Sequence, residues 1–293
     1  MVLDQEAPLI SVICPVTKMH GRLQNFSEWL ESSSEFNIEI FLVHDVQDSD
    51  TGDELRRILV QSKHPTVHFS EGKFGNAGDA RNSVLKRCKG AWICFWDSDD
   101  LPIVSEIVRQ LDDDYQVVIG EFEIHFENGE IEVYSHKKSR TACLRNVSFS
   151  PGIWRFAFRA EVIFNLKFPP FRMGEDQGFL AQIDWQKLNI KFVNRTFYKY
   201  FSGYSFQTTA RTNSRASLLD SLQFLKSLLD KGLGTPRFIH NLIFRQSLTL
   251  MKTSQREIVF QTISLYSSLI KRPKYFFGQI NALKDFIRTR IRI

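Results

Sequence analysis

Two carboxylates directly after a strongly apolar run are the residues best suited to chemistry in this chain. Residues 91–96 are all apolar, and the next four residues are Asp97, Ser98, Asp99 and Asp100. Such a run is typical of a strand that is buried on both faces, as in a parallel sheet. It would deliver Asp97 and Asp99 to the carboxyl end of the strand, which is the edge where open α/β sheets bind ligands.

Carboxylates at that edge are costly unless they meet a cation or lie open to water. A divalent metal ion carrying a phosphorylated ligand would satisfy Asp97 and Asp99. The alternative is a solvated acidic turn that caps the next helix, because Pro102 is a favourable residue for the start of a helix. This stretch alone leaves both interpretations open.

A glycine-rich segment, residues 72–82, is a second candidate site. It contains Gly75 and Gly78, and glycine allows close backbone approach while a helix N-terminus favours anions. Arg81 falls in the first turn of the helix that should follow, and its forked donors suit a phosphate. The segment is neither a Walker loop nor a Gly-x-Gly-x-x-Gly motif, so an ordinary loop and helix cap is the alternative.

Acidic residues at two further positions also suit ligand chemistry. Asp45 follows the apolar residues 38–43, where its carboxylate can accept hydrogen bonds from a base or a ribose; a turn-forming Asp is the alternative. Glu175 and Asp176 follow Gly174 at the start of a predicted helix. One of them could act as a general base near an acceptor hydroxyl. The alternative is that they cap the helix, because acidic side chains at a helix N-terminus interact favourably with the helix dipole. Because neighbouring carboxylates point in different directions, we expect one base and one structural partner.

The elements that must position these side chains alternate between strand and helix. We predict strands at residues 9–14, 38–43, 66–69 and 92–96, and helices at 22–32, at 53–61, from the glycine-rich segment through residue 87, and after Pro102. This rhythm predicts a mostly parallel sheet with helices on both faces. The later part predicts strands at 117–126 and 130–134 around an Asn128-Gly129 turn, an aromatic and partly helical segment at 153–164, a helix at 174–187 and a strand at 190–193.

Positive charge is concentrated at the end of the chain. The net charge is +5, and residues 271–293 carry seven basic residues and one acid, so that the other 270 residues sum to about −1. A near-neutral body argues against general nucleic-acid binding and indicates a local function of the tail. The pattern beyond residue 215 is helical throughout, because leucines recur there at helical spacing.

The basic tail is also amphipathic. Its apolar residues form one helical stripe with basic residues around it: Phe276, Ile280, Leu283, Ile287 and Ile291, widened by Phe277 and Phe286 and surrounded by Lys274, Lys284, Arg288 and Arg292. A basic amphipathic helix can lie on an anionic membrane as a peripheral contact. The alternative is that the stripe packs on the preceding helices and leaves the basic residues in solvent.

The cysteines and the N-terminus indicate a reducing compartment. Four scattered cysteines form no Cys-x-x-Cys pair, and residues 1–8 carry no basic signal-like segment. No apolar run approaches the roughly 20 residues needed to span a bilayer. We therefore expect free thiols and a cytoplasmic protein, at the cytoplasmic face of a membrane if the tail binds lipid.

Together these motifs resemble the family 2 glycosyltransferases, which have the nucleotide-sugar-binding GT-A fold. The resemblance covers about residues 9–205 and rests on these segments: Pro15-Val16, residues 43–50, residues 75–82, Asp97-Ser98-Asp99-Asp100, Trp154 with Phe158, and Gly174-Glu175-Asp176. The chain departs from the family after the second strand, where the usual Asp-Asp-Gly-Ser is replaced by His44-Asp45-Val46-Gln47.

The resemblance implies an α/β fold of the GT-A type, with a mostly parallel, Rossmann-like sheet flanked by helices. We expect a glycosyltransferase domain at residues 1–215, with a nucleotide-sugar-binding half at 1–114 and an acceptor-binding half at 115–215. A C-terminal, all-helical, basic extension would follow at 216–293.

The resemblance also implies a reaction, namely inverting transfer of a sugar from a nucleotide-diphosphate sugar to a glycan or lipid-linked glycan. For the donor, it implies that Pro15, Thr17 and Asp45 contact the nucleoside, that Gly78, Arg81 and Ser98 complete the donor site, and that Arg81 binds the diphosphate. It implies that Asp97 and Asp99 bind Mg²⁺ or Mn²⁺, with Asp99 as the direct ligand. For the acceptor, it implies that Asp176 is the base beside Glu175, and that Trp154 and Phe158 stack on acceptor sugars. Core packing is the alternative for the two aromatic residues.

Three rival functions remain. A basic nucleic-acid-binding protein is disfavoured because the positive charge is confined to the tail. A nucleotidyltransferase of related fold would usually carry a basic, glycine-rich loop after the first strand, where this chain has Cys14-Pro15-Val16. A non-catalytic relative that only binds sugar or nucleotide is disfavoured by the presence of Asp97, Asp99 and Asp176.

Overall fold

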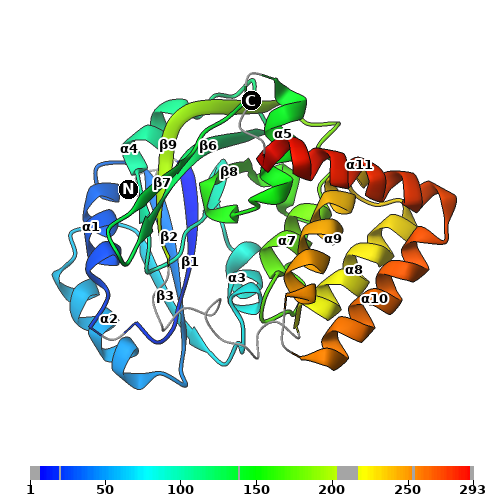
Figure 1. Cartoon of the computed structure of the whole chain (residues 1–293). Coiled ribbons are helices and arrows are strands. Elements are labelled where there is room, and N and C mark those ends of the chain that lie inside the picture. Colours follow the sequence, from blue (N-terminus) through cyan, green and yellow to red (C-terminus); the bar gives the residue numbers. More distant parts are fainter. Residues whose placement is uncertain (1–6, 20, 138, 203–216, 253–254, 291–293) are drawn as a thin grey trace. The chain divides into compact units, whose positions relative to one another are not determined.

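The computed structural model describes residues 7–19, 21–137, 139–202, 217–252 and 255–290 (Figure 1). The chain divides into two compact units that alternate along the sequence. Unit 1 comprises Met1–Ser135, Ile153–Asn165 and Asn189–Phe206, and unit 2 comprises His136–Gly152, Leu166–Leu188 and Gln207–Ile293. The domain limits expected from the sequence, at residues 114, 215 and 216, stay predictions.

Unit 1 is built on one sheet, whose strands among the described residues have the order β3-β2-β1-β4-β8-β6-β9-β5, with β7 paired to β6. Its first half is parallel and consists of β1 (Ile10–Val16), β2 (Ile38–Asp45), β3 (Val67–Gly72) and β4 (Trp92–Phe95). The strands β1, β2 and β4 are buried almost throughout, as their apolar runs predict.

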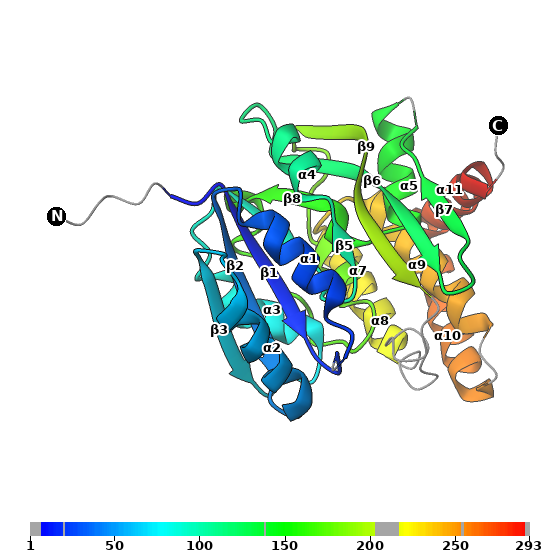
Figure 2. The same cartoon turned by 90° about the vertical axis from the view of Figure 1, so that its left-hand side faces the viewer.

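Helices cover both faces of this parallel half, which confirms the predicted α/β arrangement. In Figure 2, the helices in front of the strands are α1 (Gln24–Ser33) and α2 (Ser49–Gln61), and α3 (Ala77–Leu85) lies behind them. This placement follows from right-handed crossovers, because the chain reverses its direction across the sheet after β3. Trp29 of α1 packs edge-on against Trp96, with ring centroids 5.3 Å apart.

The second half of the sheet is mixed. It contains β5 (Leu101–Pro102), β6 (Val117–Phe126), β7 (Ile131–Tyr134), β8 (Phe156–Arg159) and β9 (Ile190–Ser202), interspersed with α4 (Val104–Gln110), the 3₁₀ turn η1 (Ile153–Arg155) and α6 (Ala160–Ile163). The predicted β6–β7 hairpin is confirmed, and Gly129 takes a φ of +85° in its turn. The strand β8 runs antiparallel to both neighbours and was not predicted.

Unit 2 is helical. Its helices are α5 (Arg140–Phe149), α7 (Glu175–Ala181), α8 (Ser217–Lys231), α9 (Pro236–Met251), α10 (Arg256–Ile270) and α11 (Pro273–Arg290). The central helix is α9, which contacts α5, α8, α10 and α11. The predicted helix at 174–187 is too long, since α7 ends at Ala181. Beyond this end, the buried indole of Trp185 folds back and donates a hydrogen bond to the Leu180 carbonyl.

The buried face of α11 differs from the packing expected for its apolar stripe. The helix buries Tyr275, Gln279, Ala282 and Asp285, whereas much of the predicted stripe is exposed: Phe276, Phe277, Leu283 and Ile287. Phe286 turns inward and packs against Phe149 and Phe244. Two predicted tail residues, Ile291 and Arg292, lie outside the described residues.

His240 provides a test of how unit 2 is packed. Its ring is buried, its Nδ1 pairs with the Gln279 side-chain amide at 2.9 Å, and burial lowers its pKa to about 4. The unfolded state therefore binds more protons below pH 6.5, and the stability present above that pH is lost as pH falls towards 4. We expect this residue to lower the free energy of unfolding by about 2 kcal/mol between pH 7 and pH 5.

Urea unfolding of the intact chain at the two pH values measures this effect. The His240→Gln variant should lose about 2 kcal/mol of the pH dependence. The control His68→Gln should keep it, because the ring of His68 is 42% exposed. An unchanged pH dependence in His240→Gln would contradict the expectation.

Candidate functional site

The carboxyl ends of the parallel strands bring several predicted site residues to one edge of unit 1. The register pairs Val16 of β1 with His44 of β2, so that Thr17 and Asp45 follow at the same level. Asp45 pairs with Gly72, where β3 opens into the glycine-rich segment. Because β4 also runs parallel to β1, Asp97 leaves the sheet at this edge. Thr17 is exposed there, and Pro15 and Asp45 are half-buried.

Arg81 forms an ion pair with the acidic stretch. It lies on α3, has only 3% of its surface exposed, and its guanidinium donates to the Asp97 carboxylate at 2.7 Å. Two predicted donor-site residues are also buried: Gly78, which precedes Arg81 on α3, and Ser98, which follows Asp97. An ion pair, not predicted from the sequence, thus joins the glycine-rich segment to the acidic stretch.

The turn after β4 is held by residues distant in the sequence. The Tyr198 hydroxyl accepts a hydrogen bond from the Asp97 backbone N–H at 2.9 Å, and the Asn25 side chain donates to the Asp99 carbonyl at 2.9 Å. The Phe201 N–H donates to the Asp100 carboxylate at 2.8 Å. Neither Tyr198 nor Asn25 was predicted at this site, because no local pattern in the sequence links them to the acidic stretch.

Negative charge is dense in this turn. Burial, followed by the charges of Asp99 and Asp97, raises the pKa of Asp100 well above its ordinary value. The pKa of the buried Tyr198 hydroxyl is likewise raised, first by burial and then by Asp100 and Asp97. Such a turn favours a cation nearby.

The carboxylates fit a hard divalent cation that shares its coordination with a ligand. Among the residues that the structure describes, no group of three His, Cys, Asp or Glu side chains could hold a metal ion by itself. Mg²⁺ is usually bound by one or two carboxylates together with substrate phosphates, and all-oxygen ligation suits Mg²⁺ and Mn²⁺. Asp97 and Asp99, both partly exposed, match that donor set.

Asp45 holds the neighbouring loop. Its carboxylate accepts from the backbone N–H groups of Gln47 at 3.1 Å and of Phe74 and Gly75 at 3.4 Å. The unusual His44 is buried and links Glu71 to the Asp48 carbonyl, at 3.1 and 2.7 Å. His44, which stands where the family usually has the first Asp of Asp-Asp-Gly-Ser, therefore orders the loop. Asp45 matches the second Asp and lies at the sheet edge.

The two aromatic residues expected at the acceptor lie in different surroundings. Trp154 is 9% exposed and stacks on Tyr198 and Tyr200, with ring centroids 4.5 and 5.5 Å apart. Phe158 has no exposed surface, because it packs in β8 against Phe156. The position of Phe158 matches the core-packing alternative, and an acceptor contact of either residue stays a prediction.

The predicted base lies in unit 2, in the first turn of α7. Asp176 and Glu175 are both half-buried, and Gly174 caps the helix with a φ of +87°. A Cβ at Gly174 would lie 3.1 Å from the Ser221 hydroxyl, so glycine suits this position in both conformation and space. Gln177 anchors the same turn, because it accepts hydrogen bonds from Arg245 and Gln246 of α9.

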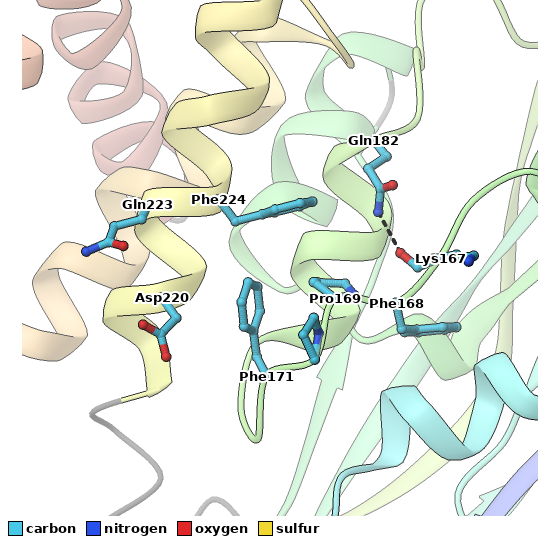
Figure 3. A pocket seen from close by; sticks show the side chains of 9 residues that line it. Lys167, Phe168, Pro169, Phe171, Gln182, Asp220, Gln223 and Phe224 are labelled. Carbon is cyan, nitrogen blue, oxygen red and sulfur yellow. Dashed lines mark hydrogen bonds between the residues drawn. The ribbon is translucent and has the colours of Figure 1, made fainter. Parts of the chain in front are cut away.

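Unit 2 also contains a pocket of about 510 Å³ beside α7 and α8 (Figure 3). Figure 3 shows Phe171 and Phe224 beside each other, and their rings meet edge to face at 5.7 Å. The amide of Gln182 donates to the Lys167 carbonyl at 2.9 Å. The wall combines apolar and polar groups, as ligand pockets do: Lys167, Phe168, Pro169, Pro170, Phe171, Gln182, Asp220, Gln223 and Phe224.

Comparison with known proteins decides the family. The sequence model of "Glycosyl transferase family 2" matches residues 11–170, which is more than half of the chain and includes the sheet edge described above. The chain belongs to glycosyltransferase family 2. Its family 2 membership confirms the resemblance drawn from the motifs.

Two curated relatives are glycosyltransferases. This family 2 chain is 24% identical over 213 residues to glycosyltransferase GlyG of Streptococcus pneumoniae, covering 66% of this chain and 70% of the relative. It is 32% identical over 105 residues to an uncharacterized glycosyltransferase of Haemophilus influenzae, covering 36% of this chain and 41% of that protein.

Solved structures share the fold. S. aureus TarS 1-349 in complex with UDP-GlcNAc aligns with a TM-score of 0.58 over 96% of this chain and 81% of that chain, at 15% identity. The mannosyltransferase PcManGT from Pyrobaculum calidifontis, in complex with GDP-Man and Mn²⁺, aligns with a TM-score of 0.58 over 97% and 87%, at 14% identity. These likenesses support the GT-A fold predicted for this family 2 glycosyltransferase.

The pair between Arg81 and Asp97 should stabilise the fold as well as the site. Arg81→Gln removes a charged donor from a partly buried carboxylate, and we expect the free energy of unfolding to fall by about 2 kcal/mol. Urea unfolding measures the change. The matched control Arg57→Gln, at an exposed position of α2, should change stability by less than about 0.5 kcal/mol. Equal stability of the two variants would refute a stabilising pair.

Proposed function

We propose that this glycosyltransferase transfers a sugar from a nucleotide-diphosphate sugar to an acceptor hydroxyl, with metal assistance and with inversion at the anomeric carbon. The observation that carries the proposal is the meeting of Asp45, Arg81, Asp97 and the glycine-rich segment at one edge of the parallel sheet. The structural neighbours TarS and PcManGT were solved with UDP-GlcNAc and with GDP-Man and Mn²⁺, which supports such a donor.

The donor is held by residues of unit 1 in this proposal. Asp45 contacts the nucleoside through its carboxylate, with Pro15 near the end of the neighbouring strand β1 and Thr17 just after it. Gly78 and Ser98 complete the donor site around Arg81. Arg81 donates to the diphosphate and keeps Asp97 oriented, because a guanidinium has donors for both. The glycine-rich segment allows the backbone to approach the phosphates closely.

Asp97 and Asp99 would hold Mg²⁺ or Mn²⁺, with Asp99 as the direct ligand. When bound there, such an ion stabilises the negative charge that develops on the departing diphosphate. The contribution of the chain is to fix the turn: Tyr198 and Asn25 hold the backbone of Asp97 and Asp99, so that little reorganisation is needed as charge develops.

On the acceptor side, Asp176 accepts the proton of the attacking hydroxyl. The hydroxyl oxygen bonds to the anomeric carbon while the bond from that carbon to the diphosphate oxygen breaks, which inverts the configuration. The first turn of α7, anchored through Gln177, orients Asp176, and Glu175 is its structural partner.

The pocket beside α8 suits part of a glycan acceptor. The aromatic rings of Phe171 and Phe224 offer apolar surface to a sugar ring, and Asp220, Gln182 and Gln223 offer polar groups for its hydroxyls. A glycan, free or linked to lipid, is therefore the acceptor class that we propose.

We propose a cytoplasmic location because the cysteine thiols are free. Cys14, Cys88, Cys94 and Cys143 are all free and buried, as expected in a reducing compartment. None of the helices in the described part of the chain is both long and apolar enough to cross a membrane.

Donor hydrolysis tests the metal and donor assignment. Purified chain is incubated with UDP-, GDP-, TDP- and CMP-sugars and Mn²⁺ or Mg²⁺, and nucleotide release is followed. We expect release from one donor class that requires the metal and falls about 100-fold or more in Asp99→Ala. The control Asp53→Ala, whose carboxylate is 71% exposed on α2, should retain full release. Metal-dependent binding without any turnover would favour a non-catalytic relative, and synthesis of the nucleotide sugar would favour a nucleotidyltransferase.

Amide variants distinguish the roles of the two carboxylates of α7. Asp176→Asn should lower transfer to an added glycan acceptor by about 10²- to 10⁴-fold and leave the dissociation constant of the donor unchanged, because the variant loses only the base. Glu175→Gln should lose less than about tenfold. Transfer rates and donor binding by calorimetry measure both effects. A larger loss in Glu175→Gln would exchange the two roles.

A further inference from the structure

The last helix of unit 2 turns an apolar face outward. On α11 the exposed fractions are 43% for Phe276, 64% for Phe277, 45% for Leu283 and 44% for Ile287. These residues recur at helical spacing, so they lie on one side of the helix. Large apolar side chains that cluster on a surface mark an interaction site more often than scattered ones do.

The orientation of α11 is fixed by polar groups on its opposite face. Asp285 is fully buried and receives two hydrogen bonds from Arg237, at 2.8 and 2.7 Å. Gln279 is buried against His240. Rotating the helix to bury the apolar face would bring Asp285 into solvent and leave its partners unpaired, which is unfavourable. The outward position of the apolar face is therefore a property of the fold.

The same helix presents only positive charge to solvent among its described side chains. Its one acid is the buried Asp285, whereas Lys274, Lys284 and Arg288 are exposed. Lys271, exposed just before the helix, adds to this charge, whereas Arg272 pairs with Asp230 at 2.7 Å.

The preceding helix also carries exposed apolar side chains. Phe260 is 77% exposed on α10, and Ile263 and Ile270 are 44% and 37% exposed. Tyr266 of α10 donates its hydroxyl to Gln279 of α11 at 3.1 Å, so the two helices are in direct contact. We name the exposed apolar and basic residues of α10 and α11 the C-terminal surface: Phe260, Ile263, Ile270, Phe276, Phe277, Leu283 and Ile287, with Lys271, Lys274, Lys284 and Arg288.

We propose that the C-terminal surface docks on an anionic lipid bilayer, with α11 lying in the plane of the interface. Apolar side chains flanked by Lys and Arg match the two components of that interface, the acyl boundary and the negative headgroups. A second copy of the chain fits less well, because a symmetric contact would bring two surfaces of the same positive charge together. The proposal goes beyond sugar transfer and does not depend on it.

Flotation of the full chain with lipid vesicles tests the proposal without donor or acceptor. The vesicles contain phosphatidylcholine alone or phosphatidylcholine with phosphatidylglycerol. The chain should float with the anionic vesicles, remain in solution with the neutral ones, and be released by high salt. Phe277→Ser should lower the partition coefficient of the chain onto anionic vesicles about tenfold, and Lys284→Gln should lower it about fivefold.

Matched controls separate docking from general effects of substitution. Val60→Ser changes an apolar residue that is 87% exposed on α2, and Lys63→Gln changes an exposed lysine; both should bind vesicles as the wild type does. Circular dichroism confirms that each variant is folded.

Binding to neither vesicle, or equal binding of all four variants, would overturn the proposal. A dimer in sedimentation that Phe277→Ser dissociates, without vesicle binding, would assign the surface to a second copy. Failure of donor hydrolysis would leave the vesicle result unaffected.

Discussion

Repulsion between the carboxylates at the end of β4 is the constraint on which the rest of unit 1 depends. The fully buried strand β4 is followed by Asp97, Ser98, Asp99 and Asp100, so three carboxyl groups meet within four residues, and that of Asp100 is itself buried. They are tolerated because Arg81 neutralises Asp97 and because backbone and hydroxyl groups hold the turn from several sides. The charge that makes the turn difficult to fold is the charge that suits it to a metal and a diphosphate.

The parallel half of the sheet follows from the sequence with simple physics. Runs that are apolar on both faces predict buried strands, and this rule holds for β1, β2 and β4. The residues after these strands lie at one edge of the sheet, where ligand binding stays a prediction. The strand β8 and the helix α5 were missed. The first is four residues within an aromatic stretch that suits strand or helix, and the second buries only Cys143, Val147 and Ser148 and so has no marked apolar face.

Contacts between distant segments account for what the sequence could not predict at the site. Tyr198 is 101 residues from Asp97, and Asn25 is 74 residues from Asp99, so no local spacing indicates either hydrogen bond. The packing of α11 was hidden for a different reason. A stripe of apolar residues normally faces the core, but here an Arg237–Asp285 pair inside unit 2 selects the polar side of the helix for burial.

The pairing of β9 with β6 has a consequence for synthesis on the ribosome. The acidic turn and its neighbours β1 to β4 are complete once about the first hundred residues have emerged, but Tyr198 and Phe201 come roughly a hundred residues later. At bacterial or eukaryotic elongation rates that interval is roughly 5–20 s. The nascent chain exposes an apolar strand edge at β4 until β8 emerges, and the acidic turn lacks the hydrogen bonds to Tyr198 and Phe201 until β9 emerges. The half-formed sheet is therefore the folding intermediate that a chaperone has most reason to protect.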